Sequence, residues 1–125
     1  MPIIRAADAP TYTIPGVLFT GLTAPSRGAS ELCTWRLEVE PGTAGDAHKL
    51  NHEEVFILLD GTLTVTVAGE AIHMAEGDAL AVPAETLLKV ANPGARSAHA
   101  IVCVPAGIRA TFADGREFGT PPWAQ

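Results

Sequence analysis

His48 and Glu54 are six positions apart in a short segment of the sequence, so an imidazole and a carboxylate occur there among apolar residues. Both side-chain types serve as general acids or bases and as ligands for divalent metals. If Glu54 points inward from a strand, Phe56 and Leu58 also point inward, because successive side chains alternate between the two faces. We therefore expect His48 and Glu54 to be catalytic groups, on adjacent strands of one hairpin and close enough to hydrogen-bond each other.

An apolar wall is expected opposite this pair, formed by Leu50, Phe56 and Leu88 as ligand-binding residues. A concave apolar site with a few convergent polar groups is typical of small-molecule binding. Arg36 lies on the polar face of its strand, where an exposed arginine is the default, but it could enter the site as an anion hook. His52 is expected in the turn between His48 and Glu54 and is the one nearby donor that could complete a metal site.

Short β-strands are the elements that must position these residues. Gly and Pro recur as turn signals, for example at Pro41-Gly42 and Asp60-Gly61, and apolar residues alternate with polar ones between them. No window of ten or more residues carries an uninterrupted helical stripe. The pattern predicts an all-β sandwich or barrel. The expected strands are 33–40, 53–59, 62–67, 78–83, 86–91, 98–104 and 109–113.

Two blocks of the sequence resemble the signature motifs of the cupin superfamily, G-x5-H-x-H-x3,4-E-x6-G and G-x5-P-x-G-x2-H-x3-N. The matching residues, at the same spacing, are Gly42, His48, Glu54, Gly61, Gly77, Pro83 and Asn92. The resemblance runs from about Leu32 to Val104 and is to small single-domain bacterial cupins. It implies a jelly-roll β-barrel, often dimeric, that holds a divalent metal on two histidines and a glutamate of the first motif and one histidine of the second.

The expected metal site is degenerate in this chain. Leu50 and Leu88 stand where the family's motifs have histidines, and Glu85 stands where the second motif has glycine. A leucine offers no donor atom to a metal. We predict no bound metal; if one is present, Zn, Fe, Mn or Ni would be held by His48, His52 and Glu54.

Length and composition limit the remaining possibilities. The 125 residues make one domain, 1–125, with a barrel core at about 17–113 and loosely ordered arms at both ends. The chain has eight basic residues and 14 acidic ones, and the basic residues are scattered singly. They form no patch that could neutralise several phosphates, so neither nucleic acid nor a membrane is expected as a partner. Cys33 and Cys103 are expected to be reduced thiols, which suits the cytoplasm. A homodimer that binds a small molecule is expected.

Three functions stay open on the sequence. The first is a metal-independent small-molecule binder, or an isomerase or cyclase that uses His48 and Glu54 for proton transfer. The second is a metal-dependent dioxygenase or isomerase with the His48, His52 and Glu54 site. The third is a non-catalytic sensor or interaction protein. The sequence identifies neither the ligand nor the pathway, and whether the protein is an enzyme is left open.

Overall fold

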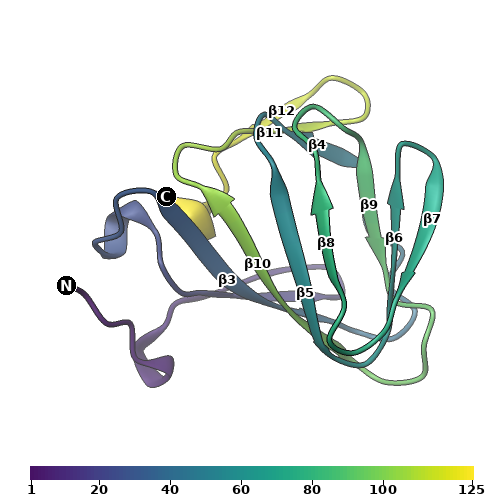
Figure 1. Cartoon of the computed structure of the whole chain (residues 1–125), viewed down its shortest axis with the longest axis horizontal. Helices are drawn as coiled ribbons and strands as arrows, with labels where there is room; N and C mark the ends of the chain where they lie inside the picture. The colour runs from purple at the N-terminus through teal and green to yellow at the C-terminus, as the bar shows by residue number, and fades with distance from the viewer.

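The computed structural model describes residues 1–125 as two six-stranded antiparallel sheets that face each other (Figure 1). The first sheet contains, in spatial order, β1 (Thr11–Ile14), β2 (Val17–Gly21), β3 (Leu32–Val39), β10 (Ala98–Pro105), β5 (Glu54–Asp60) and β8 (Ala79–Val82). The second contains β12 (Glu117–Gly119), β11 (Ala110–Phe112), β4 (His48–Leu50), β9 (Leu88–Ala91), β6 (Leu63–Val67) and β7 (Glu70–Met74). The three helices are single 3-10 turns, η1 (Ala6–Asp8), η2 (Pro25–Arg27) and η3 (Pro122–Ala124). No helix has the length and hydropathy needed to cross a membrane.

The all-β prediction is confirmed, and the alternation of side chains explains the sheets. In β3 every second residue is buried (Cys33, Trp35, Leu37 and Val39), while Arg36 between them is exposed. Strand β10, which pairs with β3 along its whole length, repeats this alternation. Each sheet therefore has one apolar face, and the two apolar faces meet between the layers.

The space between the sheets is filled unevenly. Around β5, β6, β7, β8 and β9 it is packed solid with aliphatic side chains. The most deeply buried of these are Leu58, Leu63, Val65, Val82 and Leu88, none more than 2% exposed. Around β2, β3, β4 and β11 the two layers leave room between them, as described below. The fold thus has a dense end and an open end, and His48 and Glu54 belong to the open one.

Two expectations about the chain's course are wrong. His48 and Glu54 are not on one hairpin, because β4 lies in the second sheet and β5 in the first, so residues 51–53 form a corner between layers. The end of the chain is not a loose arm: Trp123 is 8% exposed and Ala124 is 1% exposed. Apolar burial of the Trp123 ring holds this segment against the barrel, and strands β1 and β12 extend the sheets beyond the expected core.

The turn at Glu85 keeps the geometry of the glycine that the family's motif has there. Its φ is +59°, in the left-handed region that side chains other than glycine rarely adopt. Its backbone N–H donates to the Leu50 carbonyl at 2.7 Å, and its carboxylate pairs with Lys49 at 3.3 Å. These contacts with β4 hold the strained turn in place.

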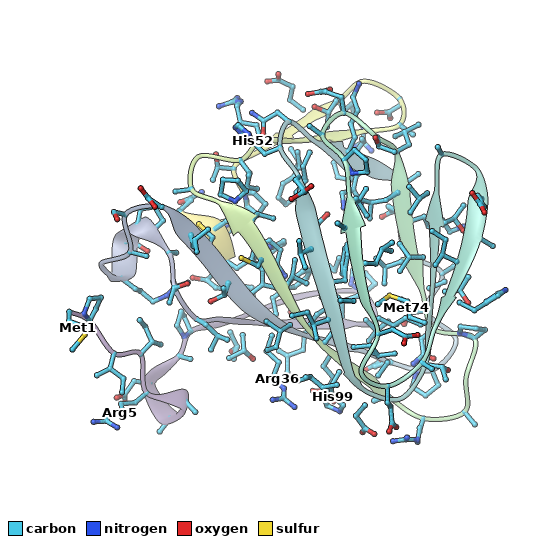
Figure 2. All side chains as sticks on the ribbon, in the orientation of Figure 1. Met1, Arg5, Arg36, His52, Met74 and His99 are labelled. Atoms are coloured by element: carbon cyan, nitrogen blue, oxygen red, sulfur yellow. The ribbon has the colours of Figure 1, made fainter.

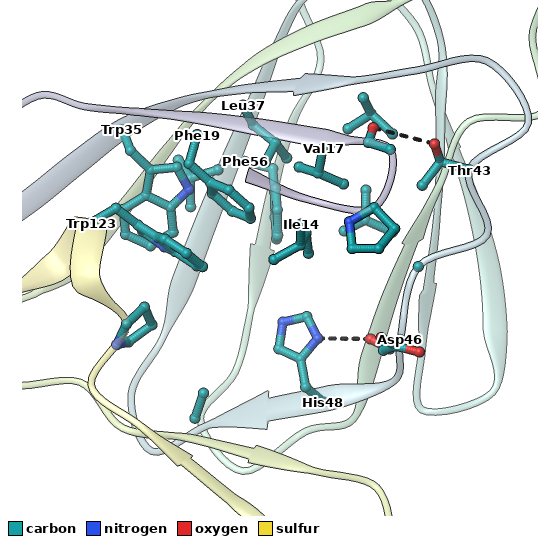
Figure 3. Close-up of a pocket in the computed structure, with 18 of the residues that line it drawn as sticks. Ile14, Val17, Phe19, Trp35, Leu37, Thr43, Asp46, His48, Phe56 and Trp123 are labelled. Carbon is teal, nitrogen blue, oxygen red and sulfur yellow. Dashed lines mark hydrogen bonds between the residues drawn. The ribbon is translucent and has the colours of Figure 1, made fainter. Parts of the chain in front are cut away.

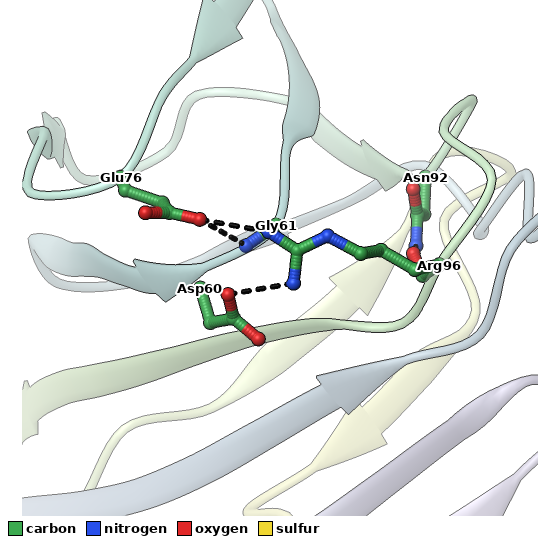
Figure 4. A network of polar contacts seen from close by, with 5 residues as sticks. All are labelled: Asp60, Gly61, Glu76, Asn92 and Arg96. Atoms are coloured by element: carbon green, nitrogen blue, oxygen red, sulfur yellow. Dashed lines mark hydrogen bonds and ion pairs between the residues drawn. The ribbon is translucent and has the colours of Figure 1, made fainter.

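Asn92, beside Arg96 in Figure 4, is fully buried and connects its own loop to the end of β3 and to the segment that follows β3. Its Nδ2 donates to the carbonyls of Val39 and Arg96, both at 2.9 Å, and its Oδ1 accepts from the Gly94 N–H at 3.0 Å. Its backbone forms two further hydrogen bonds with the mouth loop, by which we mean residues 40–47 between β3 and β4. Asn92 therefore fixes the loop that frames the open end.

Asn92→Asp should lower the free energy of unfolding by about 2 kcal/mol or more, because a carboxylate would face two carbonyl oxygens and donate to neither. Urea denaturation measures the change. Asn51→Asp is the matched control, since Asn51 uses only its Oδ1, to accept the Arg109 N–H at 2.8 Å, and an aspartate keeps that acceptor. Equal losses in the two variants would contradict the role given to Asn92.

Candidate functional site

A cavity of about 710 Å³ occupies the open end between the two sheets. Its walls come from both layers, from the mouth loop and from the last residues of the chain (Figure 3). Of its 27 lining residues 16 are hydrophobic, and the titratable ones are Glu40, Asp46, His48 and Glu54. The volume suits a small organic molecule, and the few polar groups would set that molecule's orientation.

His48 stands at the start of β4 and reaches into the cavity towards Ile14 (Figure 3). Its Nδ1 lies 2.9 Å from the backbone carbonyl oxygen of Asp46. Because a carbonyl only accepts, Nδ1 carries the proton and donates it, which leaves the lone pair of the neutral ring on Nε2. The mouth loop thus fixes both the orientation and the tautomer of a base.

Glu54 begins β5, in the opposite sheet, and its side chain is 4% exposed. Its Oε1 is buried and has no hydrogen-bond partner. Burial raises the pKa of this carboxyl from its ordinary value of 4.5 to about 8, since a carboxylate is poorly solvated there. At neutral pH the group is therefore an acid that retains a proton to donate.

Aromatic rings form one wall of the cavity. Trp123 stacks on Phe19 with 3.7 Å between ring centroids and 11° between planes (Figure 3). The centroids of Trp35 and Trp123 are 6.3 Å apart, in an edge-to-face arrangement. The ring centroids of Phe118 and Trp123 are 6.1 Å apart. The backbone of Trp123 is anchored because its carbonyl accepts a hydrogen bond from Arg27 at 3.1 Å.

The structure places some of the predicted site residues in the cavity and others outside it. Leu50 and Phe56 line the cavity with His48 and Glu54, as expected. Leu88 is 2% exposed but belongs to the solid core and does not line the cavity.

Arg36 and His52 lie outside the cavity. Arg36 projects from the outer face of the first sheet, away from the interior, and His52 is exposed at the corner before β5 (Figure 2). Arg36 as an anion hook is a wrong expectation, because its neighbour Trp35 takes the inward position and alternation turns Arg36 outward.

The predicted hydrogen bond between His48 and Glu54 is also absent. His48 donates to Asp46, and the Oε1 of Glu54 has no partner at all. The two residues face the cavity from different sheets, so a ligand between them can be reached by both.

A divalent metal does not fit this set of side chains. No three His, Cys, Asp or Glu side chains are gathered so that they could hold an ion. Leu50 occupies one expected ligand position, and His52, the one residue that could replace it, is exposed outside the cavity. One imidazole and one carboxyl leave most of a metal's coordination sphere unfilled.

Several residues of the site were not found by reasoning from the sequence. Trp35 was expected in the core or at a dimer interface, and Trp123 in a loose arm, yet both line the cavity. The alternation in β3 already marked Trp35 as inward. Nothing in the sequence signalled that Trp123 folds back onto β2 and β3, because that contact joins residues about 100 positions apart.

Comparisons with known proteins agree with this architecture. Residues 35–105 match the family model described as "Cupin domain". A curated relative, Beta-D-galactosidase Rv1717 of Mycobacterium tuberculosis, is 30% identical over 116 residues, which cover 78% of this chain and all of the relative.

Two similar solved structures have low sequence identity and bear on the fold alone. The polyketide cyclase RemF from Streptomyces resistomycificus has a TM-score of 0.77 and 14% identity, covering 98% of this chain and 88% of that one. An RmlC-like cupin from Shewanella frigidimarina has a TM-score of 0.71 and 19% identity, and the match covers 82% of this chain and 88% of that one.

The two facing sheets and the cavity at their open end define a jelly-roll barrel with an interior cavity. With the family match over more than half of its length, the chain belongs to the cupin family. The family assignment leaves the activity open, because this fold supports many unrelated functions.

Glu54 should make stability depend on pH between about 4.5 and 8. In that range the folded protein keeps a proton that the unfolded chain has released, so the free energy of unfolding falls as pH rises, by at most about 1.4 kcal/mol per pH unit. Below and above the range this contribution is constant. Glu54→Gln should remove the slope, measured by urea denaturation at several pH values.

Glu53→Gln is the matched control, because it removes an exposed carboxyl from the adjacent position and should leave the slope in place. A wild-type slope that survives in Glu54→Gln would show that another group causes it.

Proposed function

We propose that this protein binds an apolar carbonyl compound in its cavity and catalyses proton transfer on it, as an isomerase or cyclase that needs no metal. The observation that carries the proposal is the state of Glu54: a carboxyl with a buried, unpartnered oxygen and a pKa of about 8, inside an apolar cavity. An acid held neutral in this way can donate a hydrogen bond to a ligand.

The chemistry assigns one role to each polar group. The O–H of Glu54 donates to the carbonyl oxygen of the ligand, while Nε2 of His48 accepts a proton from the adjacent carbon. The electrons of the broken C–H bond form a C=C bond, and the carbonyl π electrons move to the oxygen, which takes the proton of Glu54. The product of this step is an enol.

Two outcomes follow from the enol. If the enol is conjugated with a further C=C bond, transfer of the proton from His48 to the far carbon isomerises the compound, while the enol O–H returns its proton to Glu54 and the C=O bond re-forms. Attack of the enol carbon on a second carbonyl of the same molecule instead forms a C–C bond and closes a ring. The proton on His48 then passes to the new alkoxide oxygen, and the enol O–H again returns its proton to Glu54 as the first C=O bond re-forms. The resemblance in fold to a polyketide cyclase is in keeping with the second outcome.

The geometry of the cavity supports proton transfer in two further ways. The hydrogen bond from Nδ1 to the Asp46 carbonyl keeps the lone pair of the His48 ring on Nε2, where a base needs it. The aromatic wall excludes water, which strengthens the hydrogen bond from Glu54 to the carbonyl oxygen.

Deuterium exchange tests this function without knowledge of the natural substrate. The protein should accelerate incorporation of deuterium from D₂O at the α-carbon of 2-tetralone, an apolar bicyclic ketone, followed by proton NMR. His48→Gln and Glu54→Gln should each slow the catalysed exchange by about 100-fold or more. The wild-type rate should fall as pH rises through about 8, where Glu54 loses its proton.

Exposed neighbours provide matched controls. His52→Gln and Glu53→Gln remove the same functional groups outside the cavity and should leave the exchange rate unchanged. Binding of the ketone without exchange would make the protein a binder and would contradict catalysis, whereas the absence of binding would contradict the whole proposal.

Glycoside hydrolysis is a second candidate function. Two more carboxylates, Glu40 and Asp46, line the same cavity as the protonated Glu54, and the relative from Mycobacterium tuberculosis carries the name of a galactosidase. Glycosidases commonly combine a protonated carboxyl with a second carboxylate. We rank this function below proton transfer, because the largely apolar walls offer few partners for the hydroxyl groups of a sugar.

Release of nitrophenolate from o-nitrophenyl β-D-galactoside measures hydrolysis directly. If the second candidate is correct, Glu54→Gln abolishes release and Asp46→Asn or Glu40→Gln reduces it at least tenfold. If proton transfer is correct, no release above that of the Glu54→Gln variant is expected.

A further inference from the structure

Negative charge predominates among the side chains that line the cavity. Glu40 and Asp46 lie exposed in the mouth loop, and no Lys or Arg is among the lining residues. Neither carboxylate takes part in an ion pair. A ligand that enters therefore passes two negative charges that no nearby cation neutralises.

The basic residues around the mouth do not alter this balance. Lys49, Arg109 and Arg116 belong to β4 and to the segments before and after β11, and each pairs with a carboxylate that does not line the cavity, at 3.3, 3.5 and 2.8 Å. The guanidinium of Arg116 also lies over the Phe112 ring, 4.7 Å from its centroid. Each of the three cations is thus already paired with a carboxylate, and none lines the cavity.

Inside the cavity an anion would meet no Lys or Arg, and the neutral ring of His48, whose Nδ1 donates to the Asp46 carbonyl, presents to it only the lone pair of Nε2. The one buried polar side chain there is Glu54, whose Oε1 has no partner. Loss of its proton beside an anion would place two like charges in an apolar space, and a retained proton gives only one hydrogen bond. Transfer of a charged group from water into such a space is costly unless the charge is paired.

The aromatic wall favours ligands with a flat ring. Trp123 and Phe19 are stacked nearly parallel, and Trp35 and Phe118 flank them, so one side of the cavity is a broad π surface. Offset stacking on such a surface adds to the free energy of burial of an aromatic ligand.

We propose that the cavity selects flat aromatic carbonyl compounds and excludes carboxylates and phosphates, with Glu40 and Asp46 as the specificity-determining residues at its mouth. This substrate class rests on the proposed function, since Glu54 supplies the hydrogen bond to the carbonyl oxygen. The class also fits the step assigned to that site, because an uncharged ketone is the form that enolises with Glu54 as its acid.

Three naphthalene derivatives of nearly equal shape test the charge selectivity at pH 7. They are 2-naphthamide, which is neutral, 2-naphthoate, which is an anion, and 2-naphthamidine, which is a cation. Quenching of the fluorescence of Trp35 and Trp123, both of which line the cavity, reports binding. The Kd of the amide should be at least tenfold lower than that of the naphthoate.

The double variant Glu40→Gln/Asp46→Asn should reduce this difference to about threefold or less, by improving the binding of naphthoate while leaving that of the amide unchanged. Glu53→Gln/Glu70→Gln is the matched control, because it changes the net charge equally at exposed positions away from the cavity. It should preserve the tenfold preference.

The outcomes separate the selectivity from the proposed function. Naphthoate that binds as tightly as the amide, or a preference that the double variant does not change, overturns the selectivity, while exchange into 2-tetralone would still support proton transfer. Tightest binding of the amidine with release of a proton would make Glu54 a carboxylate counter-ion and would overturn both. Failure of all three compounds to bind overturns the aromatic ligand class.

Discussion

The burial of one carboxyl group without a hydrogen-bond partner is the constraint on which the site depends. An isolated carboxylate in an apolar cavity is far less stable than in water, so Glu54 keeps its proton to a pH of about 8. The cost is borne by the rest of the barrel, whose solid end contains aliphatic side chains that are almost completely buried. A less stable scaffold would ionise this group or expose it to water.

The open end needs its own supports, because two sheets that face each other tend to close on the space between them. Asn92 fixes the mouth loop from a fully buried position, and the mouth loop in turn holds His48 through the Asp46 carbonyl. Elsewhere the stacked rings of Phe19 and Trp123 form part of the cavity wall. Polar contacts thus support the mouth loop, and aromatic packing supports another part of the wall.

Replacement of two expected metal ligands by leucines changes what the remaining pair can do. With a metal, an imidazole and a carboxylate would both be committed to the ion. Here Leu50 adds an apolar side chain to the wall of the cavity that Glu54 lines, and burial raises the pKa of the Glu54 carboxyl to about 8. Of the expected ligand positions, one imidazole and one carboxyl face this cavity.

Much of the architecture was determined by the sequence itself. Alternation in β3 favoured an inward Trp35 and an exposed Arg36, although the sequence left a role for Arg36 in the site open. The spacing of the motif residues identified the barrel and predicted the inward direction of Glu54. These features are local, because side-chain direction in a strand follows from the parity of neighbouring residues. What only the tertiary structure decided was which strands meet. The placement of His48 and Glu54 in opposite sheets, the exclusion of Leu88 from the cavity and the return of Trp123 onto Phe19 depend on contacts between distant segments, which are set by the packing of the whole core and leave no periodic signal in the sequence.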